Sequence, residues 1–202
     1  RSCKPGGLFW MRSKLTFDKL IKDYQFNTVL DVGGGTGPYK DLFMSENKKV
    51  YTSDIKESDF KGDFNEYDFG SIQFDCVWCV HTLEHQLNVN HFLTKIYSVL
   101  VEDGVLAISV PPLQHNIVGG HVSLWNAGIL LYNLILAGFD CSDAAVRTYG
   151  YDVSVIVRKR SILKLPTLRY DHGDIETLSK YFPRDLRATQ GFHGQIPAIN
   201  WE

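Results

Sequence analysis

Residues 29–37 read Val-Leu-Asp-Val-Gly-Gly-Gly-Thr-Gly, an apolar run that leads directly into a glycine-rich turn. Glycine permits a tight turn and lets a ligand approach the backbone closely. A helix that begins after such a turn offers free N–H groups and the positive end of its dipole. The stretch therefore predicts a strand, a ligand-binding turn and a helix in succession, although a plain glycine-rich turn would have the same composition.

Short β-branched runs alternate with longer amphipathic runs around this stretch. The pattern predicts strands at residues 28–32, 49–54, 74–80 and 105–110. Helices are predicted at residues 16–23, 36–46 and 90–101. This alternation is typical of a parallel sheet that helices cover on both faces.

The last third of the chain has a different pattern. A predicted helix at residues 124–136 precedes two predicted strands, 139–148 and 151–157, which are joined by only a short connection at Gly150. A parallel crossover needs a dozen or more residues, so these strands are expected to form an antiparallel hairpin. We therefore divide the chain into a lead-in with a helix (1–24), a main domain (25–160) and an irregular tail (161–202) that packs on it.

Composition and charge limit the classes of function. The 202 residues have a net charge of -2 and are 44% hydrophobic, which suits one α/β domain and provides no basic field to attract nucleic acid. The apolar stretch 127–139 is shorter than the roughly 18 residues that span a bilayer. Residues 1–7 lack the apolar core of a signal peptide, so we expect a cytoplasmic protein with no membrane attachment.

Cys76 and Cys79 form a Cys-x-x-Cys pair inside an apolar run that is predicted to be a strand. Residues three apart on a strand point to opposite faces of the sheet. We therefore interpret both cysteines as core residues rather than as a metal or redox site.

Two acidic residues fit a nucleotide-like ligand. Asp54 ends the second predicted strand, 23 positions after Asp31, where an acidic side chain accepts hydrogen bonds from ribose hydroxyls. The order of Asp31, Gly33, Gly35 and Gly37 does not give the Gly-x-Gly-x-x-Gly spacing of a dinucleotide site. A nicotinamide cofactor is therefore disfavoured.

Several blocks, in this order, resemble the class I S-adenosylmethionine-dependent methyltransferases, especially their small-molecule branch. They are residues 29–37, 51–55, 62–64, 74–85, 92–111 and 137–139. The likeness covers roughly residues 25–158. It departs from the family pattern at Glu102-Asp103-Gly104, where relatives usually carry Pro-Gly-Gly, and this change affects a turn.

The resemblance implies a Rossmann-like, doubly wound α/β fold with a mostly parallel seven-stranded sheet and a C-terminal antiparallel hairpin. It implies that S-adenosylmethionine is the cofactor. Its methionine end would be held by Asp31 and by the backbone of Gly33, Gly35 and Gly37. Its ribose would bind Asp54, and its adenine amino group would bind Asp63. Two structural alternatives stay open, since Asp31 could order the loop and Asp63 could be a turn residue.

Histidines follow the fourth and fifth predicted strands, where a substrate of such a sheet is expected. His81, Glu84 and His85 follow the fourth strand, and His115 and His121 follow the fifth. Methyl transfer from a sulfonium is an in-line displacement, so a base is needed only if the acceptor must lose a proton. We predict His81 or His121 as that base, because imidazole titrates near neutral pH.

A metal site is the alternative for these histidines. His81-x-x-Glu84-His85 resembles the Glu-x-x-Glu-His segment that binds a divalent metal in some ubiquinone-pathway and small-RNA methyltransferases, with His121 as a further ligand. Histidine in place of the first acid would shift the preference from magnesium toward zinc or manganese. We favour the base and assign no metal ligand from the sequence.

The predicted function is methylation of a small polar acceptor at an oxygen, with a saccharide or a metabolic intermediate as the expected acceptor class. An RNA 2′-hydroxyl is a second candidate acceptor, but the near-neutral charge disfavours a nucleic-acid partner. A non-catalytic protein that keeps the cofactor fold for interaction is the third possibility. The sequence makes no prediction of oligomeric state.

Overall fold

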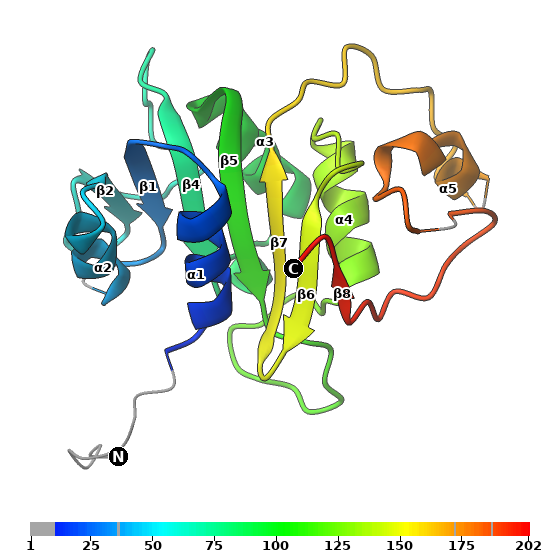
Figure 1. Ribbon diagram of the computed structural model, residues 1–202, viewed down its shortest axis with the longest axis horizontal. Coiled ribbons are helices and arrows are strands. Elements are labelled where there is room, and N and C mark those ends of the chain that lie inside the picture. Colours follow the sequence, from blue (N-terminus) through cyan, green and yellow to red (C-terminus); the bar gives the residue numbers. More distant parts are fainter. Residues whose placement is uncertain (1–10, 36, 172, 187) are drawn as a thin grey trace.

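The protein is described by a computed structural model that covers residues 11–35, 37–171, 173–186 and 188–202. The predictions for residues 1–7 and for Thr36 lie outside these ranges. The chain forms a mixed sheet in the order β3-β2-β1-β4-β5-β7-β6-β8 (Figure 1). The strands are β1 (Thr28–Val32), β2 (Lys49–Asp54), β3 (Phe60–Lys61), β4 (Phe74–Val80), β5 (Leu100–Val110), β6 (Ala145–Tyr149), β7 (Asp152–Arg158) and β8 (Ala198–Ile199).

Parallel pairing joins β3, β2, β1, β4 and β5, and the remaining strands pair antiparallel. This arrangement confirms the predicted Rossmann-like α/β class and the C-terminal hairpin. The predicted count of seven strands is wrong, because the sheet has eight. The added strand is β8, which lies in the tail and pairs with β6 through Val146 and Ile199. Two residues are too few to show an alternating pattern in the sequence.

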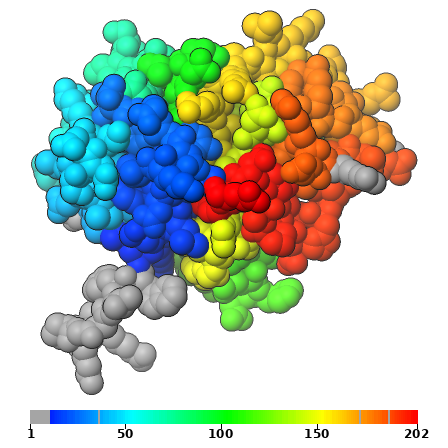
Figure 2. Space-filling model, in the orientation of Figure 1, coloured from blue at the N-terminus to red at the C-terminus, as the bar shows by residue number. Residues whose placement is uncertain are grey.

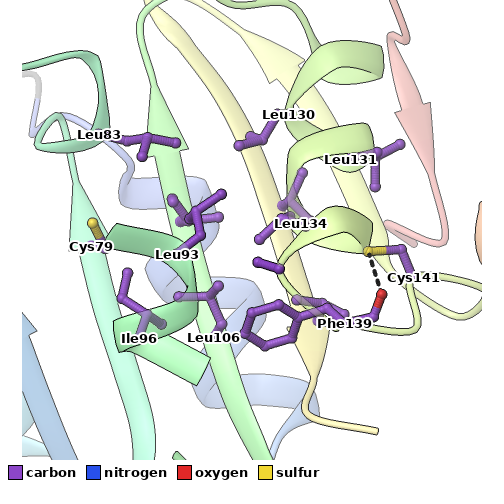
Figure 3. Close-up of a cluster of buried hydrophobic side chains, with 14 of the residues drawn as sticks. Cys79, Leu83, Leu93, Ile96, Leu106, Leu130, Leu131, Leu134, Phe139 and Cys141 are labelled. Atoms are coloured by element: carbon purple, nitrogen blue, oxygen red, sulfur yellow. Dashed lines mark hydrogen bonds between the residues drawn. The ribbon is translucent and has the colours of Figure 1, made fainter. Parts of the chain in front are cut away.

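Helices cover both faces of the sheet. The longer helices are α1 (Lys14–Asp23), α2 (Tyr39–Ser45), α3 (Val89–Val99) and α4 (Ala127–Leu136). Alternate strand residues join two separate apolar clusters, one with α3 and α4 and the other with α1 and α2. Figure 3 shows the first cluster, in which Leu93 and Leu134 face each other from α3 and α4. Cys76 and Cys79 are fully buried in opposite clusters, which confirms their assignment to the core.

Local capping explains where two helices begin. The side chain of Asn126 accepts a hydrogen bond from the backbone N–H of Ile129, so α4 begins at Ala127 rather than at the predicted residue 124. Asn88 caps α3 in the same way through His91. Helix α2 begins at Tyr39, directly after Pro38.

The first strand of the hairpin is shorter than predicted. Phe139 forms an isolated bridge with Ser161, and the next residues form a turn instead of a strand. In this turn the Asp140 side chain accepts from the Ser142 N–H, and the Ala144 N–H donates to the Cys141 carbonyl. These local bonds compete with strand pairing. Strand β6 therefore begins at Ala145.

The tail contains α5 (Asp174–Thr177), the 3-10 turn η2 (Ser179–Tyr181) and β8. It buries Leu178, Phe182 and Ile196 in the cluster that contains α4. Trp201 joins the cluster that contains α1, and the C-terminal residues lie beside the N-terminal helix on the face that Figure 2 shows. Within the described ranges, no helix has the length and apolarity needed to cross a membrane.

Candidate active site

A cavity of about 540 Å³ opens at the carboxyl ends of β1, β2 and β4. It brings together four residues predicted from the sequence: Gly33, Asp54, Asp63 and His81. Residues that the sequence analysis did not single out also line it, among them Thr82, Gln86 and the aromatic side chains of Phe64 and Phe92. The cavity therefore has an apolar wall, two carboxylates and the imidazoles of His81 and His85.

Asp31 lies directly beneath the glycine-rich turn. Its side chain is 3% exposed, and a Cβ added at Gly34 would lie 2.1 Å from its Oδ2, so only glycine fits above it. Burial, with the charge of Asp54 as a second cause, raises the pKa of Asp31 to about 7. A cation bound at the turn would favour the ionised form of this carboxyl group.

Asp54 and Asp63 lie at the far side of the cavity. Asp54 Oδ1 accepts from the backbone N–H of Lys56 at 2.8 Å. Asp63 Oδ1 accepts from the backbone N–H of Asn65 at 2.9 Å, so Asp63 is a turn residue as well as a cavity residue. Within the described part of the chain, Oδ2 of each residue has no hydrogen-bond donor and can accept a hydrogen bond from a ligand.

Gly35 and Gly37 are not in this cavity. They line a separate hollow of about 440 Å³ together with Lys40, Ser58 and Asp59. The structure thus places the glycine-rich turn between two hollows, and only Gly33 faces the cavity that contains Asp54 and Asp63.

His81 is held by a carboxylate from the hairpin. Its Nε2 lies 2.7 Å from Asp152 Oδ1, and Asp152 also accepts from the N–H and the hydroxyl of Ser13 at 2.9 and 3.1 Å. Asp152 is 4% exposed. Sequence reasoning missed it, and the signal was one acid at the start of an otherwise apolar strand. The contact forms because the hairpin turn and the start of α1 lie at the same edge of the sheet as the end of β4 (Figure 1).

Glu84 lies on the other side of His81, in the 3-10 turn η1 (Leu83–His85). It is fully buried, and neither carboxylate oxygen has a hydrogen-bond partner among the residues that the structure describes. Its Oε1 lies 3.6 Å from His81 Nδ1, 3.7 Å from His85 Nε2 and 4.0 Å from His121 Nε2. The structure therefore gathers three of the predicted histidines around one acid, whereas His115 is exposed on its loop.

The sequence matches the family model described as "Methyltransferase domain" over residues 12–140, which is more than half of the chain. The chain belongs to this methyltransferase family. Its fold is that of the class I, S-adenosylmethionine-dependent methyltransferases, so the resemblance seen in the sequence is confirmed. A comparison of the sequence with curated proteins gives no match.

Solved methyltransferases with diverse acceptors share the fold. The 1,6-didemethyltoxoflavin-N1-methyltransferase of Burkholderia thailandensis is 19% identical, with a TM-score of 0.61 over 73% of this chain and 77% of that chain. A SAM-dependent methyltransferase from Archaeoglobus fulgidus is also 19% identical, with a TM-score of 0.59 over 71% and 90%. Human N-acetylserotonin methyltransferase is 17% identical, with a TM-score of 0.58 over 71% and 51%. At these identities, the likeness establishes the fold of this methyltransferase.

Proposed function

We propose that this methyltransferase binds S-adenosylmethionine in the cavity of about 540 Å³ and methylates an oxygen of a small polar acceptor. The observation that carries the proposal is the joint position of Gly33, Asp54, Asp63 and His81 around one cavity at the carboxyl ends of parallel strands. Ligands of open α/β sheets bind at this edge.

We assign a part of the cofactor to each residue from its position around the cavity. The buried Asp31 carboxylate and the backbone of the glycine-rich turn would hold the methionine end, with Gly33 on the cavity side and Gly35 and Gly37 behind it. Asp54 would accept hydrogen bonds from the ribose hydroxyls. Asp63 would accept from the adenine amino group, and Phe64 offers an apolar surface for the ring.

His81 is the proposed general base. Asp152 accepts only, so Nε2 carries the proton of that hydrogen bond and Nδ1 is left as the basic atom. The bound cofactor supplies an electrophilic methyl group. As the acceptor oxygen forms its bond to this carbon and the sulfur–carbon bond breaks, the hydroxyl proton passes to Nδ1. Asp152 is the positioning residue, because its charge stabilises the imidazolium that results.

An oxygen acceptor is favoured by this pair. A hydroxyl must lose its proton during methylation, and the His81–Asp152 pair offers a nitrogen base together with a carboxylate that stabilises its charged form. The second predicted base, His121, lies on the loop after β5, beside a small hollow that it lines with Trp125 and Tyr151. The proposed acceptor class is a saccharide or a metabolic intermediate that carries a hydroxyl group. The net charge of -2 offers no field for RNA.

Calorimetry with S-adenosylmethionine and with its demethylated product tests the cofactor site. We expect both to bind to the wild-type protein and Asp54→Ala to abolish binding. The matched control is Asp143→Ala, a half-exposed acid in the turn between α4 and β6. Absence of binding to the wild-type protein would overturn the proposal and favour a non-catalytic role.

A labelled-methyl assay on a metabolite extract then tests the acceptor. Mass spectrometry of the labelled product identifies the acceptor and the methylated atom. Label on a hydroxyl oxygen of a small polar compound supports the proposal. Label on a nitrogen, or on RNA added to the same assay, would refute the proposed acceptor while leaving the cofactor site in place.

A further inference from the structure

We propose that Glu84, His85 and His121 form a binding site for one divalent transition-metal ion beside the cavity that His85 lines. The three ligand atoms lie within 4.8 Å of one another. The inference rests on the proposed function, since the metal would act on the methyl acceptor. It reverses the sequence-based preference for no metal ligand.

The Glu84 side chain gives the first reason. A buried carboxylate with no hydrogen bond is costly, and such groups are normally paired or bound to a metal. The Glu84 side chain is 1% exposed, and three imidazole nitrogens are within 4.0 Å of Oε1. In the described ranges, however, neither of its oxygens is at hydrogen-bonding distance from a donor. A cation between the carboxylate and the imidazoles of His85 and His121 would supply the missing partner of Glu84.

The tautomer of His85 gives the second reason. Its Nδ1 lies 2.7 Å from the carbonyl oxygen of Gly120, and a carbonyl can only accept, so Nδ1 carries the proton. In the neutral ring, Nε2 then presents its lone pair to the Glu84 carboxylate 3.7 Å away. Metal-binding histidines commonly donate their other N–H to a carbonyl in this manner.

The backbone conformation of Gly120 and its lack of a Cβ allow that contact. Its φ is +84°, and an added Cβ would lie 3.1 Å from His85 Nδ1, which is tighter than ordinary contact. The same loop carries His121, and the N–H of Val122 donates to the Glu84 carbonyl at 2.8 Å. Backbone hydrogen bonds therefore join the two loops that carry the three ligands.

His81 is not part of the ligand set. Its Nε2 is occupied by Asp152, and its Nδ1, which lies 3.5 Å from the Arg12 guanidinium, is the atom proposed to take the acceptor proton. The structure thus replaces the combination His81, Glu84 and His85 with Glu84, His85 and His121. Two imidazoles and one carboxylate favour zinc, manganese or iron over magnesium.

The geometry suits an ion that also binds the acceptor. Bonds of about 2.1 Å would require the ligand atoms to approach one another by about 1 Å, which the half-exposed His85 side chain permits. Three protein ligands leave coordination positions open. An acceptor hydroxyl bound there would have a lowered pKa and a fixed orientation toward the methyl group. His81 would then receive a proton that is already weakly held.

Metal titration of the full chain tests the site. Protein stripped with a chelator is titrated with zinc, manganese and magnesium ions, and cobalt(II) absorption reports the ligand geometry. We expect one equivalent of zinc or manganese to bind at least 100-fold more tightly than magnesium. Glu84→Gln and His121→Gln should each weaken binding at least 100-fold. The control is His91→Gln, which removes an exposed imidazole on α3.

Two outcomes would overturn the metal site. One is absence of saturable binding by the stripped protein. The other is binding that both Glu84→Gln and His121→Gln leave unchanged, provided that each variant still binds S-adenosylmethionine and is therefore folded. The failure of the proposed function is separate, because it would appear as loss of cofactor binding by wild-type protein that still binds metal.

Discussion

Asp152 and Glu84 are buried carboxylates on opposite sides of the His81 ring, but their surroundings differ. Asp152 accepts from His81 and twice from Ser13. Glu84 faces His81, His85 and His121 at 3.6 to 4.0 Å and has no hydrogen bond to its carboxylate in the part of the chain that the structure describes. Ionised Asp152 is therefore stable in the folded chain as it stands, whereas ionised Glu84 needs a cation. The first residue positions a base and the second is suited to a ligand.

The largest expected effect is on the catalytic rate, to which Asp152 contributes through His81. Asp152→Asn should lower kcat by roughly 100-fold or more, because an amide cannot stabilise the imidazolium of His81. The pKa of the base in the pH profile of kcat/KM should fall as well. Calorimetry should show unchanged affinity for S-adenosylmethionine, since Asp152 does not line the cavity.

Asp143→Asn is the control for that comparison, because Asp143 is 48% exposed and pairs only with arginines. It should leave kcat and the pH profile unchanged. A kcat for Asp152→Asn within threefold of the wild-type value would contradict the assignment of His81 and Asp152 as the base and its positioning residue.

The next effect is on the free energy of unfolding, which should change in opposite directions when Asp152 and Glu84 are replaced. Asp152→Asn should lower the free energy of unfolding by about 3 kcal/mol, because it leaves buried partners without their acceptor. Glu84→Gln should raise the free energy of unfolding of the metal-free protein by about 1 kcal/mol, because it removes an uncompensated buried charge. Urea unfolding after chelation measures both. A Glu84→Gln variant that is destabilised under metal-free conditions would show that Glu84 is already paired.

Asp31 is a third buried carboxylate, which lies beneath the glycine-rich turn of the proposed cofactor site. Burial raises its pKa to about 7 in the folded chain, above the value of 3.8 for an exposed group. Between these values the folded state binds the proton more tightly, so the free energy of unfolding should fall as pH rises from about 4 to 7. A cationic ligand binds the ionised form, so affinity for S-adenosylmethionine should rise about tenfold from pH 6 to pH 8.

Asp31→Asn tests both parts of this prediction. The variant should unfold with a flatter pH dependence and should be more stable than the wild type above pH 7 without ligand. It should also lose the pH dependence of cofactor affinity along with most of that affinity. Calorimetry at three pH values measures the affinity, and an unchanged pH dependence in the variant would exclude Asp31 as the group responsible.

Most of the fold could be predicted because its signals are local. The run from Val29 to Gly37 predicts β1 and its turn, and the short connection at Gly150 predicts the hairpin. The strand β8 could not be predicted, because its position depends on how the tail packs. The strand predicted from residue 139 begins later, at Ala145, because the side chain of Asp140 forms a turn in place of strand pairing.

The candidate site shows the same division. The glycines, Asp54 and His81 could be found because each lies at the end of a predicted strand or directly after it, whereas Asp63 was found through the resemblance to the methyltransferase family. Asp152 could not be found, since it is 71 positions from His81 and meets it only because β7 pairs with β5 beside β4. The choice between His81 and His121 as partners of Glu84 depends on the loop after β5, which has no periodic pattern.

The smallest expected effect concerns the hydrogen bonds that Asp152 receives from Ser13, at the start of α1. Ser13→Ala removes one of the three hydrogen bonds to Asp152 but keeps the bond from the backbone N–H. The free energy of unfolding should therefore fall by only about 1 kcal/mol, and kcat should fall by less than tenfold. Ser98→Ala, at an exposed serine near the end of α3, is the control and should change neither. If Ser13→Ala lowered kcat as much as Asp152→Asn, the charge of Asp152 would not be what positions His81, and the contrast with Glu84 would have to be explained by the docking of α1.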